Sequence, residues 1–99
     1  MSDQDRQAAR TRLSDLLACI RTLPAHEHLT KLIAEAEALD RAVAAFHLEG
    51  IRFRMYNVDR LVADTPVALP HEVNAAVGDI HRHLQAAGFH TRSHSAPTQ

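Results

Sequence analysis

The chain has no proline from residue 25 to residue 65, and this uninterrupted stretch constrains its fold most strongly. Apolar side chains recur along the stretch at spacings of three and four, first from Leu29 to Phe46 and then from Leu48 to Val62. This is the period of one face of an α-helix. Several alanines in the first half add helix propensity. The stretch therefore predicts an all-α fold built around one long central helix or two shorter ones.

The conformation of Gly50 decides between one long helix and two shorter ones. If the helix runs through, the glycine costs only about 1 kcal/mol relative to alanine, and the apolar residues after it continue a heptad seam. If the helix ends there, Gly50 is the left-handed residue that follows it and Ile51 is the apolar residue of a Schellman motif. A third alternative, a strand over residues 51–55, lacks an adequate partner strand. We expect three helices with a long central one, or four if the chain breaks at Gly50.

Two further segments have helical periodicity. The first covers residues 2–23, and the last is predicted to begin at Pro70, a residue type favoured at the first helical position. The last helix is expected to end at Gly88, where a glycine again precedes an apolar residue. We therefore expect a single helical domain over residues 1–89 and a disordered polar tail over residues 90–99.

Composition excludes several classes of protein. Lys plus Arg number 11 and Asp plus Glu number 12, so the formal charge is −1 with histidine neutral, unlike a typical nucleic-acid or membrane-surface protein. A single cysteine excludes a disulfide framework, and three glycines do not make a phosphate-binding loop. No apolar run approaches the length of a membrane span, and the first residues do not resemble a secretory signal. We expect a cytoplasmic protein that binds neither nucleic acid nor membrane and uses no cofactor.

The middle of the chain has more apolar side chains than one helix face can bury. Phe46 and Phe53 fall on one side of a helix, whereas Leu48, Ile51 and Met55 fall on another. One set can pack against the flanking helices, and the other then needs a second protein surface. We therefore predict a non-enzymatic interaction or assembly module, a homodimer that binds another protein. The predicted interface residues are Phe46, Ile51, Phe53, Met55 and Tyr56.

A first alternative is a small helical-bundle enzyme or ligand-binding protein. Its site would consist of Glu49, Arg52, Arg54 and Tyr56, because arginines that alternate with aromatic residues can bind a small anion. No sequence motif supports catalysis, and we predict no catalytic residue.

A second alternative follows from the eight histidines, because histidine titrates near pH ~6.5 when unperturbed. The chain could therefore be a metal or pH sensor. Asp79 and His83 are four residues apart on one helix face, and Glu72 lies about two turns earlier. These three residues form a weak candidate metal site, because their spacing matches no established metal-binding motif.

Overall fold

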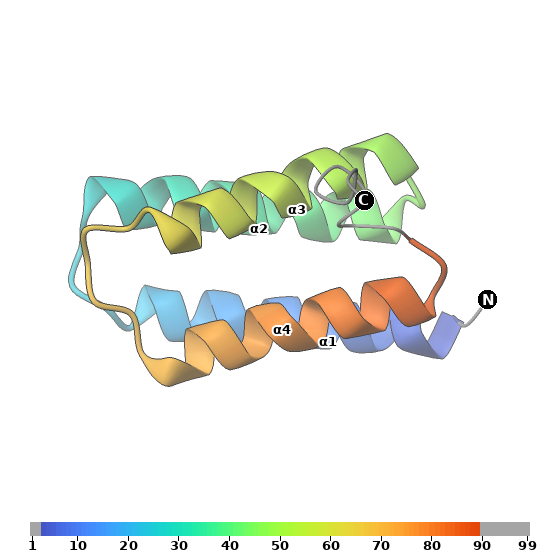
Figure 1. Cartoon of the computed structure of the whole chain (residues 1–99), viewed down its shortest axis with the longest axis horizontal. Coiled ribbons are helices and arrows are strands. Elements are labelled where there is room, and N and C mark those ends of the chain that lie inside the picture. Colours follow the sequence, from blue (N-terminus) through green and yellow to red (C-terminus); the bar gives the residue numbers. More distant parts are fainter. Residues whose placement is uncertain (1–2, 90–99) are drawn as a thin grey trace, which may run out of the picture.

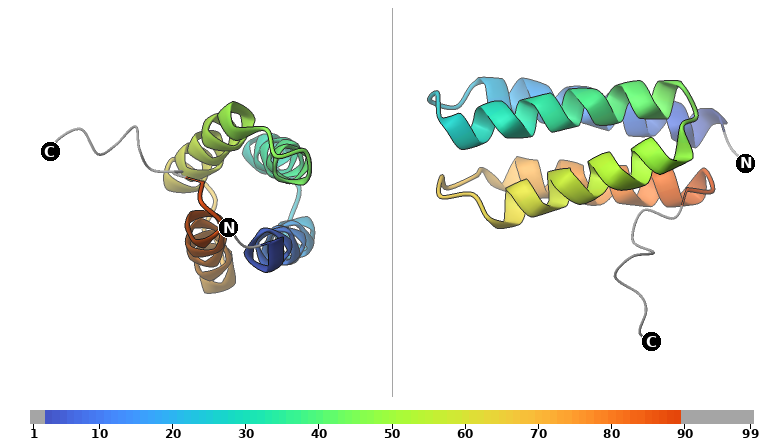
Figure 2. Two further views of the ribbon diagram at one scale, coloured as in Figure 1. Left: turned by 90° about the vertical axis from the view of Figure 1, so that its right-hand side faces the viewer. Right: turned by 90° about the horizontal axis from the view of Figure 1, so that it is seen from above.

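The computed structural model describes residues 3–89, which form an antiparallel four-helix bundle (Figure 1). The helices are α1 (Asp3–Arg21), α2 (Glu27–Ala44), α3 (Leu48–Ala63) and α4 (His71–Ala86). The helices α2 and α3 form one layer, α1 and α4 form the other, and the end-on view shows all four around one centre (Figure 2). The predicted all-α fold is thus confirmed. The predicted tail, residues 90–99, lies outside the described residues.

The predicted three-helix arrangement with a long central helix is wrong. Residues 3–89 form four helices, the number expected if the chain breaks at Gly50. The break, however, lies at residues 45–47, and Gly50 lies inside the first turn of α3. Residues 51–55 are helical rather than a strand. A continuous helix of 40 residues would be about 60 Å long at ~1.5 Å per residue. The molecule measures only 38 Å along its longest axis. The break allows α3 to fold back against α2.

The break between α2 and α3 is a Schellman motif whose left-handed residue is a phenylalanine. The Phe46 amide donates to the Val43 carbonyl at 3.2 Å, and the His47 amide donates to the Ala42 carbonyl at 3.0 Å. Phe46 has a φ of 58°, in the region that glycine normally occupies at this position. Gly88 has a φ of 101° in the same motif after α4, so the predicted end of the last helix is confirmed.

One apolar stripe from each helix forms the core between the two layers. The side chains that are less than 2% exposed include Leu13, Leu16, Ile20, Leu32, Leu39, Val43, Ile51, Met55, Val58, Val73, Ile80 and Leu84. His81 of α4 is the buried polar residue of the described chain, and its Nε2 lies 2.9 and 3.0 Å from the two carboxylate oxygens of Asp59 in α3. This bond connects the two layers. Within residues 3–89, no helix is both long and apolar enough to cross a membrane.

Candidate functional site

Three large apolar side chains remain on the surface of the described residues, and all lie close together in sequence. Phe46 is 49% exposed, Leu48 is 46% exposed and Phe53 is 56% exposed. By contrast, the predicted interface residues Ile51 and Met55 are fully buried in the core of the chain itself. The sequence grouped Leu48 with those two residues. The structure separates them because α3 starts at Leu48, at the corner of the bundle.

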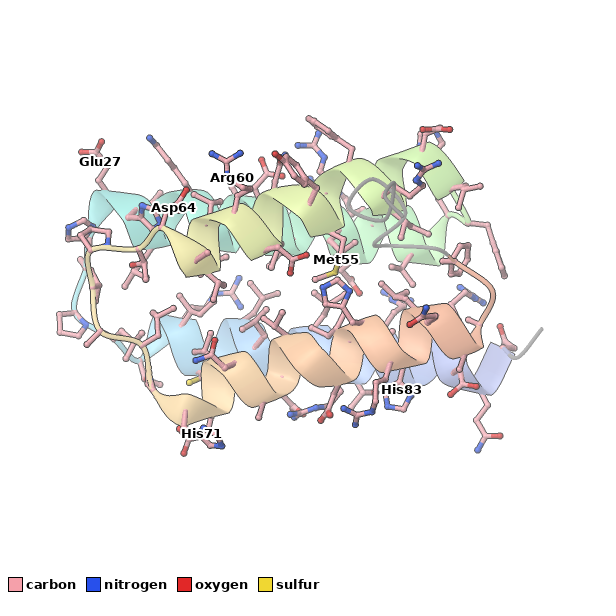
Figure 3. All side chains as sticks on the ribbon, in the orientation of Figure 1. Glu27, Met55, Arg60, Asp64, His71 and His83 are labelled. Atoms are coloured by element: carbon pink, nitrogen blue, oxygen red, sulfur yellow. The ribbon has the colours of Figure 1, made fainter. Side chains whose placement is uncertain are left out.

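The outward face of α3 carries a stripe of four residues: Glu49, Phe53, Tyr56 and Arg60. Their spacings of four, three and four place them within about 60° of one another at ~100° per residue. Arg60 points away from the bundle, whereas Met55 on the opposite face of the helix points between the layers (Figure 3). Tyr56 is half-buried and the other three are exposed. We call these four residues the outer stripe.

Cations flank both aromatic rings of the outer stripe. The Arg60 guanidinium donates to the Tyr56 hydroxyl at 2.8 Å and lies 5.7 Å from the centre of that ring. The hydrogen bond to Tyr56, then the charge of Tyr56, and then the hydrogen bond and charge of Asp64 raise the pKa of Arg60 above its usual value. Arg54 lies 5.0 Å from the centre of the Phe53 ring. The stripe therefore combines apolar area with charge, as protein-binding surfaces commonly do.

The alternative ligand site is only partly assembled. A shallow depression on the surface of α3 is lined by Glu49, Arg52, Phe53 and Tyr56. Arg54 lines a different surface, because it turns toward α2 and donates to both carboxylate oxygens of Glu35 at 3.1 and 3.3 Å. The four predicted ligand-site residues therefore do not converge on one enclosed cavity.

The corner next to α3 contains a contact that the sequence did not suggest. The Arg6 guanidinium lies 4.3 Å from the centre of the Phe46 ring and donates to the Val43 carbonyl at 3.4 Å, at the carboxyl end of α2. It also donates to the Ala44 carbonyl at 3.5 Å and to the Asp3 carboxylate at 2.6 Å. The Phe46 ring also packs against Phe89, with ring centres 6.0 Å apart. Arg6 is about forty residues from Phe46 in sequence, so no local pattern could have paired them.

The weak candidate metal site is not assembled. Asp79 bonds to Arg12 at 2.9 Å and also to Arg82, whereas His83 lies 3.2 Å from Asp5 on α1. Within residues 3–89, no group of three or more His, Cys, Asp or Glu side chains is arranged to hold a metal ion. The set Glu72, Asp79 and His83 therefore does not form a metal-binding group, because two of its members bind side chains of neighbouring helices or of α4 itself.

Several histidines have structural contacts instead. The Nδ1 atoms of His26 and His47 accept hydrogen bonds from main-chain amides at the starts of α2 and α3, at 2.9 and 3.0 Å. His28 lies 2.6 Å from the carbonyl of Leu61, in the last turn of α3. Helix ends have main-chain groups without a partner inside the helix. These three histidines therefore satisfy helix ends.

Comparison of the chain with protein-family models, curated proteins and solved structures found no match. The functional argument consequently rests on the surface of the bundle alone.

Proposed function

We propose that this chain is a small non-enzymatic helical interaction module that works as a homodimer. The observation that carries the proposal is the set of exposed side chains Phe46, Leu48 and Phe53. One chain already closes a core with residues from all four helices, and none of these three side chains belongs to that core. Large apolar side chains left exposed within one short segment of a small protein are typical of a binding surface.

The backbone of Phe46 supports this interpretation. A left-handed conformation costs an ordinary residue roughly 1–2 kcal/mol, and glycine would avoid that cost. The phenylalanine is nevertheless half exposed at this position. Strain of this kind is a reason to look for a function, and aromatic residues are frequent anchors of protein interfaces.

The two predicted partners use different parts of this surface. The outer stripe of α3 is the surface for a second copy of the chain. The corner formed by Phe46 and Leu48 is left for a further protein. The enzyme and sensor alternatives gain less support, because Arg54 is paired with Glu35 and several of the histidines are bonded at helix ends or to aspartates. The expected cytoplasmic location rests on the sequence.

The homodimer is tested by sedimentation and light scattering of the full chain over a concentration series. We expect a mass that rises toward two chains with concentration. In parallel, amide NMR shifts should change on dilution for α3 and stay constant on the outward face of α1, which serves as an internal control. A mass of one chain at every concentration, with unchanged shifts in α3, would refute the proposal.

A further inference from the structure

Building on the proposed homodimer, we infer that two copies join through the outer stripe of α3 in an antiparallel orientation. In this pairing, Glu49 of each copy faces Arg60 of the other. Phe53 of each copy faces Tyr56 of the other. The occupant of the stripe is therefore a second copy of this chain, and the two helices lie side by side across a two-fold axis.

The stripe is complementary to itself. Glu49 and Arg60 lie at equal distances on either side of the midpoint between residues 54 and 55, and so do Phe53 and Tyr56. A two-fold axis through that midpoint exchanges each member of a pair with the other. The carboxylate of one copy then meets the guanidinium of the other at both ends, and the aromatic rings meet in the middle. Such an interface, with the same patch on both subunits, is the commonest kind in homo-oligomers.

A parallel pairing of the same stripes is disfavoured by charge. It would place Glu49 against Glu49 and Arg60 against Arg60, and like charges brought together at an interface repel. The antiparallel orientation replaces both repulsions with attractions. The order of charges along α3, acidic at the start and basic near the end, therefore selects the orientation as well as the partner.

Three of the four side chains in this pairing are exposed, and Tyr56 is half-buried. Glu49 is exposed and has no hydrogen bond or ion pair within residues 3–89, so its carboxylate is available to a second copy. The side chain of Arg60 is 61% exposed, and its bond to Asp64 is long, at 3.5 Å. Phe53 is 56% exposed and would be covered. Within the described chain, the outward faces of α1, α2 and α4 present no large exposed apolar side chain of this kind.

Cysteine cross-linking tests the orientation. In a Cys19→Ser background, one variant carries Glu49→Cys and another carries Arg60→Cys. Each variant then has a single cysteine, so every disulfide between protein chains joins two copies. With oxidised glutathione, we expect a cross-linked dimer in the mixture of the two variants and little in either variant alone. Cross-linking of each variant with itself would indicate a parallel pairing and overturn the inference.

Charge reversal tests the contacts themselves. Glu49→Arg and Arg60→Glu should each raise the dimer Kd about tenfold, and the double variant should restore most of the affinity. Glu72→Arg is the matched control, because Glu72 is the second residue of α4 as Glu49 is of α3. That control should leave the Kd unchanged.

The outcomes separate this inference from the proposed function. A dimer whose Kd is unaffected by Glu49→Arg and Arg60→Glu would refute the outer stripe as the contact while leaving the homodimer intact. A wild-type chain that is monomeric at every concentration would refute both.

Discussion

Replacing Phe46 by glycine and by alanine separates the two effects of this residue on stability. The ring is 49% exposed and contacts Phe89 and Arg6. Truncating a fully buried phenylalanine to alanine costs about 3–5 kcal/mol, so a half-buried ring should cost roughly 1.5–2.5 kcal/mol. Phe46→Ala removes the ring and retains a side chain in the left-handed region. We therefore expect it to be the less stable of the two variants.

Phe46→Gly should recover part of that loss. Glycine relieves roughly 1–2 kcal/mol of left-handed strain, and its greater freedom in the unfolded chain cancels about 0.4–1 kcal/mol of the gain. The glycine variant should thus be more stable than the alanine variant by roughly 0.5–1 kcal/mol. For a domain of this size, that corresponds to a Tm difference of about 2–8 °C.

Urea unfolding followed by far-UV circular dichroism measures this difference, with equal m-values required for the comparison. Ala44→Gly provides the control, because residue 44 is the last residue of α2 and has no left-handed strain to relieve. The same alanine-to-glycine change should be destabilising there, by up to about 1 kcal/mol. If glycine at position 46 were no more stable than alanine, the argument that Phe46 is strained would be refuted.

Two further predictions concern Gly50 and Asp79. A Cβ added at Gly50 would lie 2.5 Å from Nδ1 of His47, the ring that caps α3. Gly50→Ala should therefore displace this ring and lower the free energy of unfolding by up to about 1 kcal/mol, as measured by urea unfolding. A variant more stable than the wild type would contradict this. The hydrogen bond from Arg82 and then the nearby Arg12 lower the pKa of Asp79 below its usual value of 3.8. Its contribution to stability is therefore present above about pH 4 and is lost as the pH falls through the lowered pKa. Asp79→Asn should thus be less stable than the wild type at neutral pH, and the difference in stability should narrow as the pH falls below about 4. A gap of constant size between these pH values would contradict the assignment.

Periodicity alone identified which segments are helical. The leucines of residues 2–23 and the apolar positions of residues 70–87 recur every three or four residues, and all-α structure follows directly from this local pattern. The end of the last helix was also predictable, because Gly88 is the residue type that most easily adopts a positive φ. These features depend on near neighbours in the chain, so the sequence contains the information to predict them.

The position of the break between α2 and α3 was not predictable in the same way. Gly50 was the local signal for a helix end, whereas the left-handed residue is Phe46. The fold stabilises that conformation with groups that are distant in sequence, since Arg6 from α1 stacks on the Phe46 ring and bonds a carbonyl at the end of α2. Tertiary packing thus outweighs the local backbone preference at this point.

The same distinction applies to the candidate site: local sequence predicts some of its residues, and tertiary packing decides the others. The sequence by itself placed Phe46, Phe53 and Tyr56 among the interface residues, because aromatic side chains in an apolar-rich stretch exceed what one helix face can bury. Only the tertiary structure decided that Ile51 and Met55 belong to the core and that Arg60 completes the outer stripe. Which side of α3 faces solvent depends on where α2 ends and how α3 folds back against it. That choice is set by contacts between distant segments, which no local pattern encodes.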